Sequence, residues 1–410
     1  MVSTSAPAGI TGAPFRFMLG VTVLCFSGYA LLLPVVPLWA DRGGSGALGS
    51  GATTAALMAT TVATQLAVPW LLVRTSHRLV LAVGSVLLGA PTPFLALSAE
   101  LTPVLLLSAL RGVGFGLATV AGAALVAELV PRAEHGRAAG RYGLAVGLPQ
   151  IVLLAAGVAL VERFGFTAVF IAAGVAPLLG ALLVPAIRRP PPSAPRADGP
   201  APRPPLRLVV IPVLAMFLCS IAQGGLITFL PLAVPGAGLL VLGALLATTA
   251  GAMLGRVVAG ELVDRRGWGG RLLVPGIVLT IAGMVTEVAA LHTGTGALLV
   301  LGAAAVGFGF GVVQNDSLTV LFAAFGSAGY GAASAIWNIS FDAGTGAGAL
   351  AFGAVAEPFG YPAAFGATAA LLGVGVLAAM IRPRAGLSVR STGGRASRRR
   401  RADPPARRRT

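Results

Sequence analysis

The 410-residue sequence has little charge for its length. Only 10% of its residues are charged, and its mean hydropathy is +0.89. So few polar side chains cannot cover the surface of a water-soluble protein of this size, and that class is excluded. Runs of roughly 18 or more apolar residues recur along the chain, and each can cross a hydrocarbon core about 30 Å thick. The composition predicts a helical membrane protein with many spans.

Cysteine and histidine are scarce, and lysine is absent. The two cysteines, Cys25 and Cys219, lie inside apolar runs, and the three histidines lie in or near predicted loops. We therefore expect no disulfide framework, no metal site and no other cofactor. All 29 basic residues are arginine, and many lie in the tail from Arg382 onward. A basic tail at an anionic membrane surface accounts for this charge, so we expect no nucleic-acid partner.

Polar or Gly/Pro-rich connectors divide the apolar runs into twelve predicted transmembrane helices. They cover residues 16–39, 52–73, 79–98, 103–128, 142–161, 167–187, 208–232, 238–262, 272–291, 296–322, 330–354 and 363–382. Eight of the eighteen residues 188–205 are proline, so this stretch is a tether and not a helix. We predict a six-helix half over 1–187, a linker over 188–206, a second six-helix half over 207–385 and a disordered tail over 386–410.

Arginine is distributed unevenly between alternate connectors. The connectors after the second, fourth and eighth spans read "RTSHR", "PRAEHGRAAGR" and "DRRGWGGR", and the linker after the sixth span also contains arginines. Connectors on the other side carry few charges. By the positive-inside rule, both termini and the arginine-rich connectors are cytoplasmic in a bacterial-type plasma membrane, and the first apolar run is a retained helix.

The two halves resemble each other in sequence. Cys25 precedes Pro37 by twelve residues, and Cys219 precedes Pro231 by the same distance. "VGFG" occurs at 113–116 and again at 306–309, and "VERFGF" at 161–166 corresponds to "AEPFGY" at 356–361. The offsets are 194, 193 and 195 residues. Parallel six-helix repeats predict a pseudo-two-fold axis along the membrane normal, with a substrate site between the halves.

A charged turn follows the eighth span. Its sequence, "GELVDRRG" followed by "GGR", resembles the signature of the major facilitator superfamily, whereas the first-half counterpart "PWLLVRTSHR" is degenerate. The resemblance implies an all-α fold of twelve transmembrane helices in two pseudo-symmetric bundles, transport by alternating access, and no enzymatic activity. It also implies a cytoplasmic latch between the halves, formed by Gly260, Leu262, Asp264, Arg265, Gly267 and Arg271. The alternative is that this turn only anchors the topology.

Three charged residues are predicted near the middle of spans. Each of Arg111, Asp316 and Asp342 would cost about 2.5–3.5 kcal/mol if it faced lipid, so they should face a cavity or one another. Arg111 resembles the span-four arginine that the family's drug and proton antiporters use in proton transfer. Asp342 is our candidate proton carrier, and Asp316 is the second candidate. The alternative is that these charged residues form ion pairs with a structural role only. Arg256 and Glu287 are predicted nearer the span ends, where charged heads reach water easily.

Family resemblance implies that spans one, four, seven and ten line the cavity. Together with span eleven, they give the candidate substrate residues Tyr29, Gln223, Gln314, Asn315, Trp337 and Asn338. Hydrogen bonding between helices is the alternative for each of them. Span five contains "VGLPQ", which resembles the antiporters' glycine–proline motif incompletely, and Pro149 should bend this helix.

These observations predict a proton-coupled exporter of small, largely apolar compounds. Its partners would be the small-molecule substrate, protons and the lipid bilayer, and the chain would work as a monomer. An uptake symporter for a metabolite or sugar is the alternative within transport. A membrane sensor or lipid-handling protein that does not transport is the alternative from another class.

Overall fold

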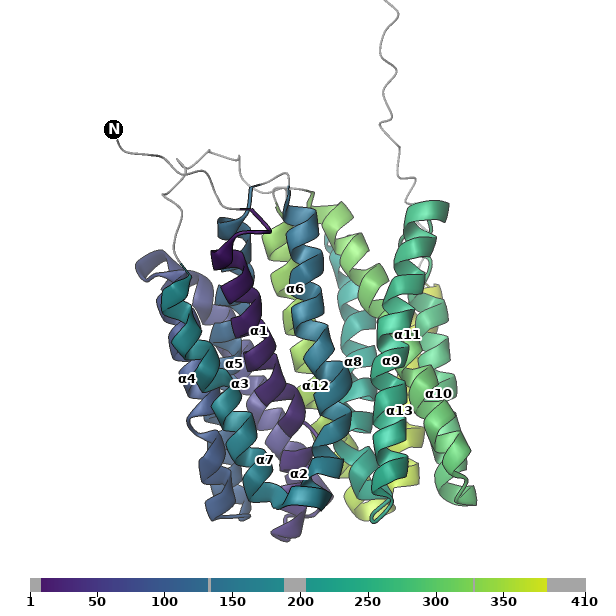
Figure 1. Cartoon of the computed structure of the whole chain (residues 1–410). Coiled ribbons are helices and arrows are strands. Elements are labelled where there is room, and N and C mark those ends of the chain that lie inside the picture. Colours follow the sequence, from purple (N-terminus) through teal and green to yellow (C-terminus); the bar gives the residue numbers. More distant parts are fainter. Residues whose placement is uncertain (1–8, 132–133, 188–203, 327–328, 382–410) are drawn as a thin grey trace, which may run out of the picture.

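The computed structural model describes residues 9–131, 134–187, 204–326 and 329–381, and all regular elements in these ranges are helices (Figure 1). The predicted tail at 386–410 and most of the predicted linker lie outside them. The first half contains α1 (Ala13–Leu32), α2 (Val35–Arg42), α3 (Gly46–Arg74), α4 (His77–Gly89), η1 (Thr92–Leu97), α5 (Leu101–Leu129), α6 (His135–Pro149), η3 (Gln150–Leu154), α7 (Ala155–Leu183) and η4 (Val184–Ala186). The second half contains α8 (Leu206–Ala233), α9 (Gly238–Arg266), α10 (Leu273–Thr293), α11 (Gly296–Phe325), α12 (Tyr330–Phe359) and α13 (Tyr361–Ile381).

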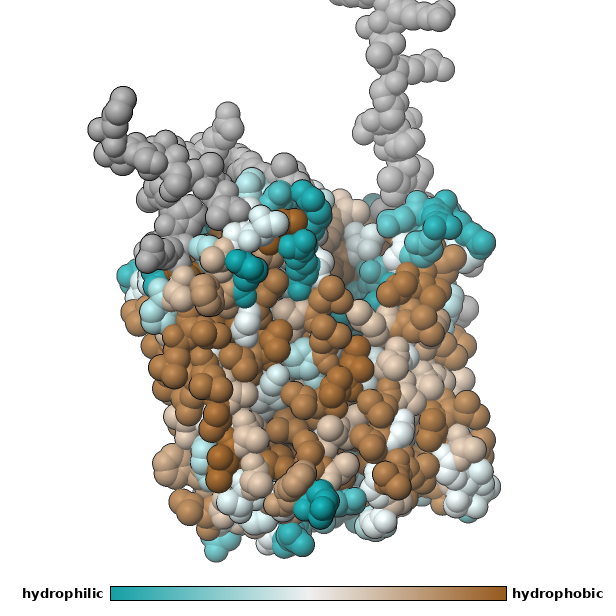
Figure 2. Space-filling model, in the orientation of Figure 1, coloured by the Kyte–Doolittle hydropathy of each residue, from teal (hydrophilic) through white to brown (hydrophobic). Residues whose placement is uncertain are grey.

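The helices make the twelve predicted crossings. In the described ranges, nine segments are long and apolar enough to span a membrane, and one of these is the 47-residue Gly140–Ala186. This segment makes two crossings, because the backbone of Gly165 is left-handed (φ 80°) and interrupts α7. The 29-residue α3 and the apolar α13 complete the twelve. The two halves lie side by side with their helices roughly parallel (Figure 1), and an apolar belt separates two polar ends (Figure 2).

Glycines bring the helices of each half into close contact in the same pattern. Gly112 and Gly116 of α5 face α3 and Gly114 faces α4, and a Cβ at any of the three would overlap the neighbouring helix. In α11, Gly307 and Gly311 face α9 and Gly309 faces α10 in the same way. The two sets are 195 residues apart. The predicted repeat is therefore present, but the offset of 193 predicted from "VGFG" is two residues out of register.

The two cysteines occupy related positions in these bundles. The Cys25 thiol lies 3.2 Å from the Ser85 hydroxyl, and the Cys219 thiol lies 4.0 Å from the Thr280 hydroxyl. Both cysteines are buried and free. Ser85 and Thr280 are also 195 residues apart, which supports the register given by the glycines.

The halves meet along two helix pairs, α3 with α12 and the α7/η3 region with α9. We call the end that carries the turns after α3 and α9 the arginine-rich end. At the opposite end, the Glu357 carboxylate of α12 accepts a hydrogen bond from the Leu48 amide at the start of α3 (2.7 Å). The Glu162 carboxylate of α7 lies against Gly238 at the start of α9. Because Glu162 and Glu357 are 195 residues apart, each half places a related carboxylate on the other half's helix N-terminus.

Candidate functional site

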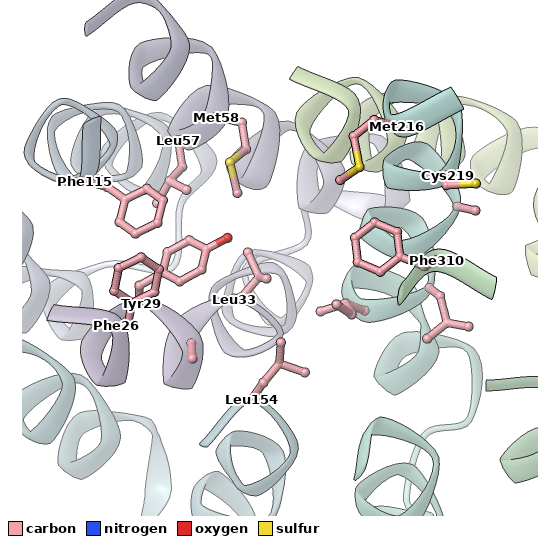
Figure 3. Close-up of a cluster of buried hydrophobic side chains, with 14 of the residues drawn as sticks. Phe26, Tyr29, Leu33, Leu57, Met58, Phe115, Leu154, Met216, Cys219 and Phe310 are labelled. Atoms are coloured by element: carbon pink, nitrogen blue, oxygen red, sulfur yellow. The ribbon is translucent and has the colours of Figure 1, made fainter. Parts of the chain in front are cut away.

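A cavity of about 70 Å³ lies between the two halves. In Figure 3, Tyr29, Leu33 and Leu154 of the first half face Phe310 of the second across the middle of the molecule. The polar lining of the cavity consists of Tyr29, Gln150, Gln223, Thr249, Arg256, Gln314 and Thr345. The apolar lining includes Leu33, Ile151, Leu154, Ile227, Met253, Phe310 and Phe341. This arrangement suits a compound with a mainly apolar body and a few polar groups.

Three of the predicted substrate residues line this cavity. Tyr29 stacks on Phe115 with ring centroids 4.1 Å apart, and Gln223 shares hydrogen bonds with the Thr248 hydroxyl (3.2 Å). Tyr29 and Gln223 are 194 residues apart, so the first helix of each half contributes an equivalent position. The Gln314 side-chain oxygen accepts a hydrogen bond from Arg256 Nε.

The other three predicted substrate residues lie elsewhere. The Asn315 amide points toward Gly260 of α9, about 3.8 Å from where a Cβ at that glycine would be. Trp337 Nε1 donates to the Ser317 hydroxyl (3.0 Å), so this indole joins α12 to α11. Asn338 is exposed, and its amide donates to the Ser334 carbonyl of its own helix (2.8 Å). Each step along a helix turns a side chain by about 100°, which carries Asn315 away from the cavity although Gln314 faces it.

Two cavity residues were missed or misplaced by sequence reasoning. Arg256 was predicted near a span end, but it lines the cavity and is the only charged residue in its described lining. Gln150 begins η3, a π-helical turn directly after Pro149. Proline lacks the amide hydrogen that a regular helix needs, and π turns often occur at functional sites. The bend predicted at Pro149 is thus a local widening of the helix, which places Gln150 in the cavity wall.

Glu287 lies toward the end of α10, as predicted, but its carboxylate does not reach water as expected there. Its side chain is fully buried in α10 against Gly302, and neither carboxylate oxygen has a hydrogen-bond partner among the described residues. No set of three metal-ligating side chains comes together in the described ranges. Glu287 therefore stands alone, outside the cavity between the halves.

Asp342 joins the two halves. Its side chain is 3% exposed, and its carboxylate accepts a hydrogen bond of 2.7 Å from the Gln65 amide of α3. The Gln65 side-chain oxygen has no partner. Among the described residues, Asp342 forms no ion pair with an arginine. Gln65 was not predicted, and its only signal in the sequence is a lone amide within an apolar span.

Arg111 is buried on the other side of Tyr29. Its side chain is 2% exposed, its Nε has no hydrogen-bond partner, and it lines a cavity of about 10 Å³ together with Tyr29 and Ser108. A volume of this size holds about one water molecule. Tyr29 lies within electrostatic range of both Arg111 and Asp342. The two charged residues predicted to take part in proton transfer therefore lie near the same tyrosine.

Asp316 lies elsewhere than predicted. Its fully buried carboxylate accepts hydrogen bonds from the amides of Gly270 (2.7 Å) and Leu272 (2.8 Å), in the turn between α9 and α10. It does not line the cavity between the halves. Its position therefore fits an anchor for the charged turn and not a carrier that moves protons through the cavity.

The charged turn itself is mostly exposed. Gly267 ends α9 with a left-handed backbone (φ 64°), and Arg265 forms an ion pair with Glu261. Asp264 is exposed and has neither a hydrogen bond nor an ion pair within the described chain. The nearest atom to a Cβ built on Gly260 is Asn315 Oδ1 at 3.8 Å, so this glycine does not mark a close contact between helices. Leu262 packs against the small buried cluster of Ala259, Leu272 and Val312, and Arg271 is exposed.

The corresponding turn after α3 is built differently. The Ser76 hydroxyl accepts a hydrogen bond from the Leu79 amide (3.2 Å) and so caps α4. His77 lies 2.8 Å from the Glu128 carboxylate of α5, and Arg78 donates to the Pro185 carbonyl (2.9 Å). Side chains of the turn itself therefore fix its position here.

Solved transporter structures share this architecture. A bacterial homologue of the human lysosomal transporter Spinster, in an inward-facing and occupied conformation, is 15% identical with a TM-score of 0.74, and the match covers 91% of this chain and 96% of that one. A D-xylose–proton symporter is 16% identical (TM-score 0.70; 90% and 96% covered). A nucleoside transporter is 14% identical (TM-score 0.67; 89% and 100% covered). At these identities the likeness concerns the fold.

The sequence itself decides the family. None of the curated proteins matches the chain. A family description, the Major Facilitator Superfamily, matches residues 18–329, which is more than half of the chain. The chain therefore belongs to the Major Facilitator Superfamily, as a multi-pass membrane transport protein and not an enzyme.

Proposed function

We propose that the chain is a proton-coupled exporter, which moves small, largely apolar compounds across the plasma membrane by alternating access. The observation that carries this proposal is the hydrogen bond from Gln65 to Asp342. It places a buried, titratable carboxylate directly on the contact between the two halves. Any change in the protonation of Asp342 therefore acts on that contact.

The energetics of this contact give a coupling mechanism. Within the described residues, Asp342 is buried with one hydrogen bond and no ion pair, and burial of an ionised carboxylate in such a place is unfavourable. A bound proton removes this charge and lets α3 and α12 remain packed. Loss of the proton favours separation of the helices at this point, because water can then solvate the carboxylate. Proton occupancy and the arrangement of the halves are linked in this way.

Arg111 would act in the step of the transport cycle that releases the proton. It is a buried cation that forms no ion pair with a carboxylate of the described residues, close to the tyrosine that also lies near Asp342. A rearrangement that brings Arg111 closer would favour the ionised form of Asp342 and release the proton. We propose export and not uptake because Arg111 of α5 and the glycine–proline stretch before η3 resemble features of antiporters.

The test begins with a screen for exported compounds in a drug-sensitive host that expresses the chain. A compound whose accumulation falls is then used in labelled form with purified protein in liposomes. We expect Asp342→Asn to abolish flux driven by a pH gradient and to keep exchange without a gradient, because only the proton step is lost. Glu100→Gln, which removes an exposed carboxylate, is the matched control and should behave as the wild type.

Two outcomes would change the proposal. Full gradient-driven flux in Asp342→Asn would remove this residue from the coupling step. Accumulation of the compound in expressing cells, driven by inward proton movement, would make the chain an uptake symporter.

A further inference from the structure

We propose that the transported compound carries a single negative charge, on a carboxylate or a similar anionic group, and that Arg256 binds this group in the central cavity. The inference rests on the proposed transport function and names its substrate class. It starts from a cation in the cavity that no carboxylate in the described part of the chain neutralises.

Arg256 has no counter-charge among the residues that the structure describes. It is the only charged residue in the described lining of the cavity, and its contact there is the hydrogen bond from Nε to Gln314. No carboxylate forms an ion pair with it among the described residues. A guanidinium offers five N–H donors in a planar fork that matches a carboxylate, and a cation within a membrane protein is stable only with such partners or water. The remaining donors are therefore available to a ligand.

The repeat shows what occupies the related position in the other half. Leu57 and Thr248, 191 residues apart, face the equivalent glycines Gly112 and Gly307. The same offset relates Gln65 to Arg256. The amide on α3 and the guanidinium on α9 are therefore equivalent positions in the two halves.

Gln65 and Arg256 have different partners on the facing helix. Gln65 donates to Asp342 of α12. The residue 195 positions before Asp342, at the offset that relates the starts of α12 and α6, is Gly147. Gly147 lines the same cavity as Arg256, and no atom lies within 4 Å of where its Cβ would be. One side of the interface thus has a protein carboxylate, whereas the related side has a cation, a glycine and open space that a ligand's carboxylate can fill.

The rest of the cavity limits the ligand further. Tyr29, Phe310 and Phe341 supply aromatic surface, and Gln150, Gln223 and Gln314 supply neutral hydrogen-bonding groups. A single cation suits one negative charge and not a polyphosphate. The expected ligand is therefore an amphipathic monoanion with an aromatic or aliphatic body.

The test compares three compounds that share one body and differ in charge, namely phenylpropionate, phenylpropionamide and phenylpropylamine. Their binding to the purified full-length protein is measured at neutral pH. We expect the acid to bind about tenfold or more tighter than the amide, since charge-assisted hydrogen bonds are about twice as strong as neutral ones, and the amine to bind weakest. Arg256→Gln should reduce binding of the acid to the level of the amide and leave the amide unaffected.

Two further variants separate charge at the site from other effects. Arg256→Lys keeps the positive charge and should keep the preference for the acid. Arg207→Gln removes an exposed arginine at the start of α8 and should change nothing. Unchanged binding of the amide to Arg256→Gln shows that its cavity is folded.

The inference is overturned if the wild type does not bind the acid in preference to the amide and the amine, or if Arg256→Gln keeps the preference. A preference that depends on Arg256, combined with no flux of any compound in liposomes, would support this anion site and contradict the proposed transport function. The two proposals can therefore fail separately.

Discussion

The two ends of the molecule use the repeat differently. At the end opposite the arginine-rich turns, Glu162 and Glu357 occupy related positions and perform the same task, since each lies on the first turn of a helix in the other half. At the arginine-rich end, the turn after α9 is held by Asp316, and the position 195 residues earlier is Ala121, whose methyl side chain cannot accept a hydrogen bond. The turn after α3 depends on Ser76 and its neighbours instead.

This difference shows which contacts the pseudo-symmetry fixes. A carboxylate on a helix N-terminus requires only an exposed acid beside free amides, so both halves can keep it in register. The turns at the other end differ, and only one has the well-preserved signature. We infer that the symmetric end closes both helix pairs alike and that the asymmetric end has specialised in the second half.

Replacement of the anchor should have the largest effect on stability. Asp316→Asn removes the charge and leaves one acceptor oxygen for two buried amides, so we expect a loss of about 1–3 kcal/mol. Ser76→Ala removes a neutral cap from the related turn and should cost about 1 kcal/mol. Thermal unfolding of both variants in detergent measures the difference. Equal losses would mean that the two turns depend on their anchors to the same extent.

Removal of the two glutamates should have an intermediate effect. Each contact between a carboxylate and a helix N-terminus contributes about 0.3–1 kcal/mol, so Glu162→Gln and Glu357→Gln should each open this end slightly and together more strongly. The measurement is the rate at which an impermeant maleimide alkylates Thr54→Cys, a buried position beside Arg111. Glu100→Gln is the control. Unequal single effects would show that the symmetric contacts are not equivalent in function.

The smallest effect on stability is expected at Asp264. This side chain is exposed and has no partner in the described part of the chain, so Asp264→Asn should leave the unfolding temperature unchanged. If the turn acts as a latch in another arrangement of the halves, turnover of a labelled compound in liposomes should nevertheless fall. Wild-type turnover would reduce the turn to an anchor of topology.

The sequence predicted the architecture well, because run length, connector composition and repeats act over many residues. It also predicted that Tyr29, Gln223 and Gln314 line a cavity between the halves, because few polar side chains occur on the helices expected to surround it. It could not place Asp316, since the loop amides that this carboxylate binds follow no helical periodicity. Gln65 and Arg256 were missed as site residues for a related reason. A lone polar residue in an apolar run can face a neighbouring helix, a cavity or water, and only the packed structure distinguishes these.

The glycine contacts within each half determine how the protein can move. Backbone lies against backbone where α5 meets α3 and α4, and again where α11 meets α9 and α10, so neither bundle has slack to absorb a local shift. Each bundle therefore moves as a rigid body. Movement of α3 away from Asp342 must tilt the whole first bundle. The start of α3 and Glu162 of α7 then move with that bundle, relative to their contacts Glu357 and Gly238 in the second half. Under the proposed coupling, protonation of Asp342 would therefore alter the contacts of both glutamates at the opposite end of the molecule through rigid-body movement alone.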